Sequence, residues 1–98
     1  MTLRHVVAWK LAASDPAVRD EQARQISDRL MALVGVVPSI GSLSVGPNVI
    51  DGNWDVALVA DFEDAAALDA YQVHPVHQEV VAYVRSVVSD RVAVDFEI

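Results

Sequence analysis

The 98-residue sequence contains no cysteine. Disulfide bonds, metal sites built on thiolates and cysteine nucleophiles are therefore all excluded. A lack of cysteine also fits a reducing compartment, so we expect a cytoplasmic location. Long apolar runs are missing too, because no stretch approaches the ~18 to 20 uncharged apolar residues that a helix needs to span a bilayer. We therefore expect no membrane-spanning segment.

Basic residues are scarce: seven lysines and arginines face fourteen aspartates and glutamates, for a net charge of −7. This balance argues against sequence-independent binding of nucleic acid and against binding to anionic membranes. The charge is unevenly spread, since residues 1–38 carry five basic and four acidic side chains while residues 39–98 carry two basic and ten acidic ones. We interpret the acidic surplus as a solvated surface that keeps the protein soluble.

Apolar residues are abundant, at 53% of the chain with a mean hydropathy of +0.30. The length fits one domain over residues 1–98, and so small a domain buries only a limited fraction of its surface. A second subunit is the natural place for the remaining apolar surface, because obligate dimer interfaces resemble a domain core cut in half. We therefore expect a homodimer.

Hydrophobic periodicity divides the chain into strands and helices. Ser14-Asp15-Pro16 and Asp64 are typical helix starts, and Gly35 and Pro38 are typical of a helix end. The expected strands are 5–11, 40–45, 56–62 and 92–98, and the expected helices are 16–34, 65–71 and 75–88.

This order is β-α-β-β-α-β, with the second α split at His74-Pro75. Right-handed crossovers turn that order into an α+β fold with a four-stranded antiparallel sheet and all helices on one face. Segments 5–11 and 56–62 are apolar on both faces, so the uncovered face should pack against an identical sheet across a two-fold axis. The pattern therefore predicts a dimeric α/β barrel.

The segment from Tyr71 to His77 places two imidazoles and a phenol within seven residues. Imidazole changes charge near neutral pH, which makes His77 a candidate general base. Tyr71 would orient His77, and His5 is a further candidate for the same site. Positions 71 and 77 do not share a face of one continuous helix, so the break at His74-Pro75 must bring them together.

Less specific interpretations stay open for the same residues. His77 also fits a helix-start residue without a substrate, and His74, which precedes proline, fits a helix-boundary residue in extended backbone. A metal site built from His5, His74 and His77 is not supported, because no carboxylate has a recognisable ligand spacing. No glycine-rich phosphate loop, nucleophile elbow or dinucleotide fingerprint is present, so we expect no cofactor.

Several local patterns together resemble the stress-responsive A/B barrel domain (Dabb) family. They are His5-Val6-Val7-x-Trp9-Lys10-Leu11, Phe62-Glu63-Asp64 leading into Leu68-x-x-Tyr71, His74-Pro75-x-His77-x-x-Val80, and Val94-Asp95-Phe96. The resemblance covers essentially the whole chain, and Tyr-x-x-His-Pro-x-His is its most specific element. It implies a ferredoxin-like protomer that forms a dimeric α+β barrel.

The resemblance leaves the activity open, because the family contains stress-associated assembly proteins, proteins without an assigned activity and a few polyketide cyclases. In the plant cyclase that forms olivetolic acid, pocket residues fall on His5, Tyr71 and His77 of this chain. The resemblance to that cyclase implies that His77 removes a proton from a carbon between two carbonyls. It further implies that Tyr71 orients His77 or donates to the developing enolate oxygen, and that His5 binds a carbonyl oxygen. That cyclase has a further histidine where this chain has Val56, which is a departure from its pattern.

Together these observations predict a cavity in each protomer that takes a small apolar or polyketide-like molecule. The expected catalytic residues are His77, Tyr71 and His5, and the expected wall residues are Trp9, Val7, Val56 and Phe96. Two alternatives are an aldol-type cyclase that uses His77 as its base, and a stress-associated assembly protein without chemistry.

Overall fold

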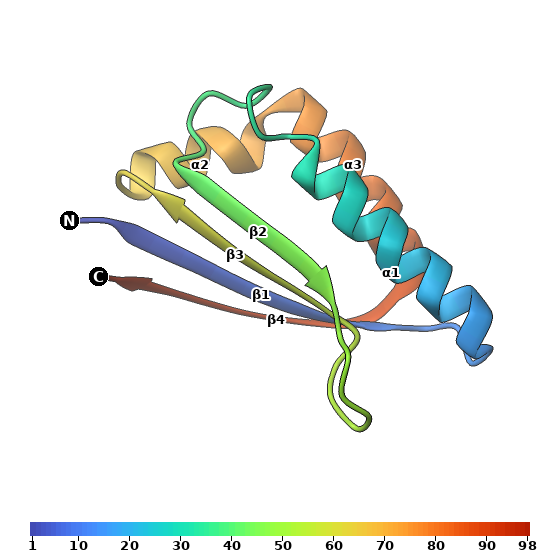
Figure 1. The fold of residues 1–98 in the computed structure, drawn as a ribbon. Helices are drawn as coiled ribbons and strands as arrows, with labels where there is room; N and C mark the ends of the chain where they lie inside the picture. The colour runs from blue at the N-terminus through green and yellow to red at the C-terminus, as the bar shows by residue number, and fades with distance from the viewer.

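A four-stranded antiparallel sheet carries three helices on one of its faces in the computed structural model, which describes residues 1–98 (Figure 1). The strand order β2-β3-β1-β4 places β1 between β3 and β4, as its two apolar faces predict. The expected α+β fold and element order are confirmed. The elements are β1 (Leu3–Leu11), α1 (Pro16–Met31), β2 (Ser42–Pro47), β3 (Val56–Phe62), α2 (Ala65–Val73), α3 (Pro75–Val87) and β4 (Val88–Glu97).

Two aspartates begin helices as their positions in the sequence predict. Asp15 precedes α1 and its side chain accepts a hydrogen bond from the Ala17 N–H at 2.9 Å. Asp64 precedes α2 and accepts from the Ala67 N–H at 2.9 Å. Each cap satisfies a backbone donor that has no partner within the first turn of its helix.

The bounds of every element except β3 differ from the prediction by one to four residues. Helix α1 ends at Met31 instead of residue 34, and β4 begins at Val88, directly after α3, instead of residue 92. Strand β2 starts two residues later than expected, because the Ile40 N–H donates to the Val37 carbonyl in the preceding turn. Gly41 then passes so close to β3 that a Cβ atom there would lie 2.7 Å from the Asp61 carbonyl oxygen.

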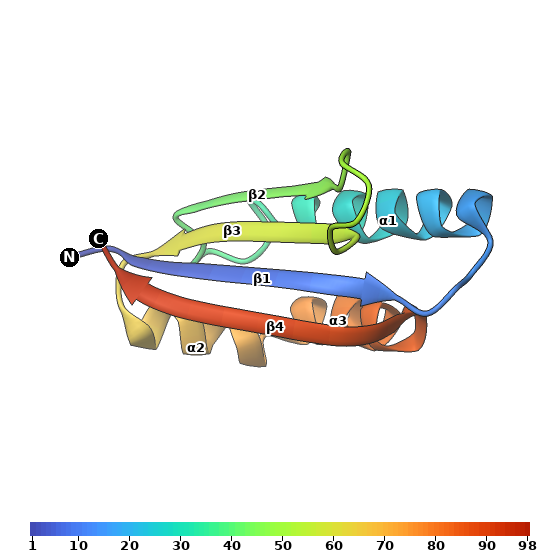
Figure 2. The same ribbon diagram turned by 90° about the horizontal axis from the view of Figure 1, so that it is seen from below.

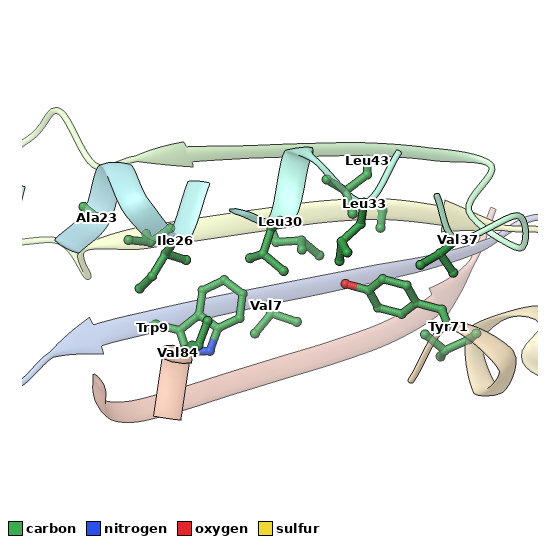
Figure 3. Packing of buried hydrophobic residues seen from close by; sticks show 14 of the residues in the cluster. Val7, Trp9, Ala23, Ile26, Leu30, Leu33, Val37, Leu43, Tyr71 and Val84 are labelled. Carbon is green, nitrogen blue, oxygen red and sulfur yellow. The ribbon is translucent and has the colours of Figure 1, made fainter. Parts of the chain in front are cut away.

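The hydrophobic core lies between the sheet and the helices (Figure 3). Alternate residues of β1 and β3 point into it because side chains alternate between the faces of a strand. The buried residues of this layer include Val7, Trp9, Leu11, Val56, Leu58, Ala60 and Phe62 from the sheet, and Ala23, Ile26 and Leu30 from α1.

The other face of the sheet, here called the open face, is covered by no element of the chain (Figure 2). Val94 and Phe96 of β4 lie on it, paired with Val6 and Arg4 of β1, and they remain 58% and 43% exposed. The prediction that Phe96 lines the cavity is therefore wrong, because strand alternation turns its side chain away from the helices. No helix of this fold combines the length and hydropathy that crossing a membrane requires.

Candidate functional site

A cavity of about 610 Å³ lies on the helix-covered side of the sheet. Its volume falls within the ~300 to 1,000 Å³ that is usual for small-molecule sites. Its lining comes from β1, α1, β3, α2, α3 and β4, so segments far apart in the sequence meet there. The lining residues include His5, Val7, Trp9, Leu58, Tyr71, Gln72, His77, Val81, Val84, Arg85 and Arg91.

His5 is held by a carboxylate from the neighbouring strand. The register pairs His5 with Asp95, and the His5 Nδ1 atom is hydrogen-bonded to the Asp95 carboxylate. The His5 side chain is only 5% exposed, whereas that of Asp95 is 40% exposed. Because a carboxylate only accepts, Nδ1 carries the proton and Nε2 is left as an acceptor in the neutral ring.

The motif residues Tyr71 and His77 stack on each other. Their ring centroids are 4.0 Å apart with an interplanar angle of 40°, and the two residues are 2% and 9% exposed. The contact depends on His74, which ends α2 in extended backbone and caps α3 by accepting the Val76 N–H at its Nδ1 atom, 3.2 Å away. The predictions that the break joins Tyr71 to His77 and that His74 is a boundary residue are confirmed.

His77 is oriented by the last turn of α2. Its Nδ1–H donates to the Gln72 carbonyl over 3.3 Å, which leaves Nε2 as an acceptor. Burial lowers the pKa of His77 below its ordinary value of 6.5, and the nearby Arg91 guanidinium acts in the same direction, while the hydrogen bond to the Gln72 carbonyl opposes the shift. His77 is therefore neutral at pH 7, the state that a general base requires.

Burial shifts the pKa of Tyr71 in the opposite direction to that of His77. Burial raises the pKa of its hydroxyl to about 12, although the Arg91 guanidinium opposes this increase. Tyr71 is therefore protonated at pH 7 and can donate a hydrogen bond. Its hydroxyl points toward Val7 and Trp9 between the sheet and α1 (Figure 3), and its ring centroid lies 5.1 Å from that of Phe62.

Five of the seven residues predicted for the site line the cavity: His5, Val7, Trp9, Tyr71 and His77. Val56 does not line it, although its side chain faces the helices. It is 1% exposed in the core, on β3, one strand further from β4 than its register partner Trp9. Phe96 lies on the open face, as described above.

Sequence reasoning missed Asp95 and Arg91. The alternation of the last strand contained a signal for both, because residues 91, 93 and 95 must lie on the face opposite Phe96. The missing information was the register that sets Asp95 beside His5 and Arg91 beside Trp9. No group of three His, Cys, Asp or Glu side chains is placed to hold a metal ion.

Comparisons with known proteins agree with this architecture. The family model of the stress-responsive A/B barrel domain matches residues 3–98. A dimeric ferredoxin-like protein of unknown function from Thermobifida fusca is 30% identical, with a TM-score of 0.84 and coverage of 100% of this chain and 92% of that one. No curated protein matches the sequence significantly.

Two further solved structures share the fold at lower identity. A dimeric protein of unknown function from Bacteroides fragilis is 24% identical, with a TM-score of 0.91 and coverage of 99% of this chain and 96% of that one. The hydroxynitrile lyase from Passiflora edulis is 16% identical, with a TM-score of 0.81 and coverage of 99% and 93%. The family model spans nearly the whole chain, and this protein therefore belongs to the stress-responsive A/B barrel domain (Dabb) family.

Proposed function

We propose that the cavity binds a small molecule with an apolar body and a carbonyl group, and that His77 removes a proton from the carbon beside that carbonyl. The observation that carries this proposal is the stacked pair of a neutral imidazole and a protonated phenol in a cavity where 8 of the 16 lining residues are hydrophobic. Apolar walls with a few convergent polar groups are typical of small-molecule sites.

The proposed step needs only groups that the chain supplies. The Nε2 atom of His77 accepts the proton, and the electron pair of the broken C–H bond moves onto the carbonyl oxygen as an enolate. The Tyr71 hydroxyl donates a hydrogen bond to that oxygen, which stabilises the charge as it develops. His5, held by Asp95, acts as a second proton acceptor at the same cavity.

Deuterium exchange of the protons between the two carbonyls of 2,4-nonanedione tests this step by NMR in D₂O. We expect the protein to exchange them faster than buffer does. The variant His77→Gln should remove most of the excess, since general-base catalysis contributes ~10² to 10⁴-fold. His74→Asn is the matched control, because His74 caps α3 without lining the cavity, and it should keep the wild-type rate.

Asp95→Asn tests the supporting role of His5 in the same assay. An amide can donate to His5 as well as accept from it, so the proton on Nδ1 is no longer fixed. We expect a partial loss of exchange that is smaller than the loss in His77→Gln. Equal rates for the wild type and His77→Gln contradict a base at residue 77.

We further propose that the protein is a homodimer joined through the open face. Support comes from the exposed apolar side chains there, Val59, Val92, Val94 and Phe96, and from the description of the Thermobifida fusca relative as dimeric. We place this dimer in the cytoplasm, which fits the absence of cysteine. The comparisons single out neither the aldol-type cyclase nor the assembly protein, because the related structures include both proteins of unknown function and a lyase.

A further inference from the structure

Two arginines of the cavity stand out by their position in the sequence. Arg85 of α3 and Arg91 of β4 are the only basic residues after residue 38, in a segment that carries ten acidic side chains. Both line the cavity. The most acidic part of the chain thus places its entire positive charge at one site.

These two arginines also differ from the others in their interactions. The remaining four arginines are engaged: Arg4 pairs with Asp61, Arg19 with Asp55 and Arg24 with Glu21, and Arg29 stacks over the Tyr83 ring. Neither Arg85 nor Arg91 makes an ion pair or a side-chain hydrogen bond. Their guanidinium groups are therefore free to bind an anion.

The one acidic residue of the lining does not neutralise them. Asp90 accepts a hydrogen bond from the backbone N–H of Arg91 at 2.9 Å, and its carboxylate makes no ion pair. Its negative charge disfavours a second charge on a bound anion, and so favours a monoanionic carboxylate over a phosphate dianion. A planar guanidinium also matches the two oxygens of a carboxylate.

The register between β1 and β4 sets the distance between Arg91, at the positive end of the cavity, and His5, at the proposed reactive end. Arg91 pairs with Trp9 and Asp95 pairs with His5, so the two ends are four residues apart along β4. At the usual rise of a strand this separation is ~13 Å. Arg91 is exposed and His5 is buried, so the arginine marks the mouth of the cavity and His5 its interior.

We propose that the ligand is an amphipathic monocarboxylic acid whose carboxylate is bound by Arg91 at the mouth, with Arg85 adding positive charge. Its apolar body lies between the sheet residues Val7 and Trp9 and the α3 residue Val84, and its far end reaches Tyr71 and His77. This inference rests on the proposed small-molecule cavity and names the class of molecule that it takes.

The test compares octanoate with 1-octanol, which has a chain of the same length without the charge. Binding is followed at pH 7 by amide NMR shifts of the cavity residues during titration. We expect the wild type to bind octanoate about tenfold more tightly than 1-octanol, the effect of one hydrogen bond to a charged group. Arg91→Gln should remove this preference and leave the affinity for 1-octanol unchanged, and Arg91→Lys should keep part of it.

Arg24→Gln is the control, because Arg24 is an exposed arginine of α1 that does not line the cavity. It should bind both compounds like the wild type. Equal affinities for octanoate and 1-octanol in the wild type, or an equal loss of both in Arg91→Gln, overturn carboxylate recognition while the cavity remains a binding site. No shift with either compound overturns the proposed small-molecule function as well.

Discussion

At the scale of single residues, burial shifts the pKa values of Tyr71 and His77 in opposite directions and leaves both side chains uncharged. Desolvation disfavours the charged form of each group, so it raises the pKa of the phenol to about 12 and lowers that of the imidazole. Both side chains are therefore neutral at pH 7. The pair then offers one donor and one acceptor, which is the combination that proton transfer next to a carbonyl requires.

The lowered pKa of His77 predicts a pH-dependent stability. Well above pH 6.5 the side chain is neutral in both the folded and the unfolded chain, and it contributes no pH dependence. As the pH falls below 6.5, the unfolded chain takes up a proton that the folded protein does not, so the free energy of unfolding decreases, by at most about 1.4 kcal/mol per pH unit. Urea unfolding between pH 5 and 8 at one protein concentration measures this effect.

The variant His77→Gln supplies the comparison for this prediction. Glutamine does not titrate, so the variant should lose less stability than the wild type between pH 6.5 and pH 5. Parallel curves for the two proteins over that range contradict a lowered pKa at residue 77.

At the scale of secondary structure, the break between α2 and α3 builds the site. In one continuous helix, the side chains of residues 71 and 77 would point about 120° apart around the axis, since successive residues turn by ~100°. The extended backbone of His74 redirects the chain, and Pro75 starts α3 at a position where its missing N–H costs nothing. The break therefore lets Tyr71 and His77, which would lie on different faces of one continuous helix, stack on each other.

We expect His74 to act through its cap alone. His74→Ala removes the acceptor for the Val76 N–H and should lower the free energy of unfolding by ~1 kcal/mol, the usual contribution of an N-cap. His74→Asn, which keeps a capping side chain, should restore most of it. Chemical denaturation of both variants measures the difference, and a loss of octanoate or ketone binding in fully folded His74→Asn contradicts a purely structural role.

At the scale of the whole molecule, the sheet is two-sided but the chain covers only one side. The helices bury the inward residues of β1 and β3, whereas the apolar side chains of the open face stay in contact with water in the isolated protomer. Covering such a surface removes apolar area from water, which is the main favourable contribution to most protein association. The second layer is the proposed partner subunit.

A homodimer predicts an unfolding temperature that rises with protein concentration, because dissociation accompanies unfolding. Calorimetry across a hundredfold range of concentration measures this dependence. Val94→Lys places a charge on the open face and should yield monomer in sedimentation velocity. Val73→Lys is the control, since Val73 is 70% exposed on α2, away from the open face, and should remain dimeric. A wild-type protein that sediments as a monomer at every concentration contradicts the dimer.

The sequence alone determined the element types and their order, because each depends on local signals. Asp64 and Pro75 mark helix starts through backbone chemistry that acts over one turn, and the alternation in residues 56–62 needs no distant partner. The same alternation places Val7 and Trp9 together on one face of their strand. The break at His74 was also local, and it was sufficient to bring Tyr71 to His77.

Only the tertiary structure decided which residues share the cavity. The partnership of His5 with Asp95 and the position of Arg91 beside Trp9 depend on the register between β1 and β4, the first and last strands of the chain. Phe96 was assigned to the wrong face of the sheet. Val56 was assigned to the correct face, but it lies in the packed core and not at the cavity. Both errors have the same cause. The alternation of side chains shows only that a strand has two faces. The neighbouring strands and the helices packed on them decide which face is covered and where a cavity remains.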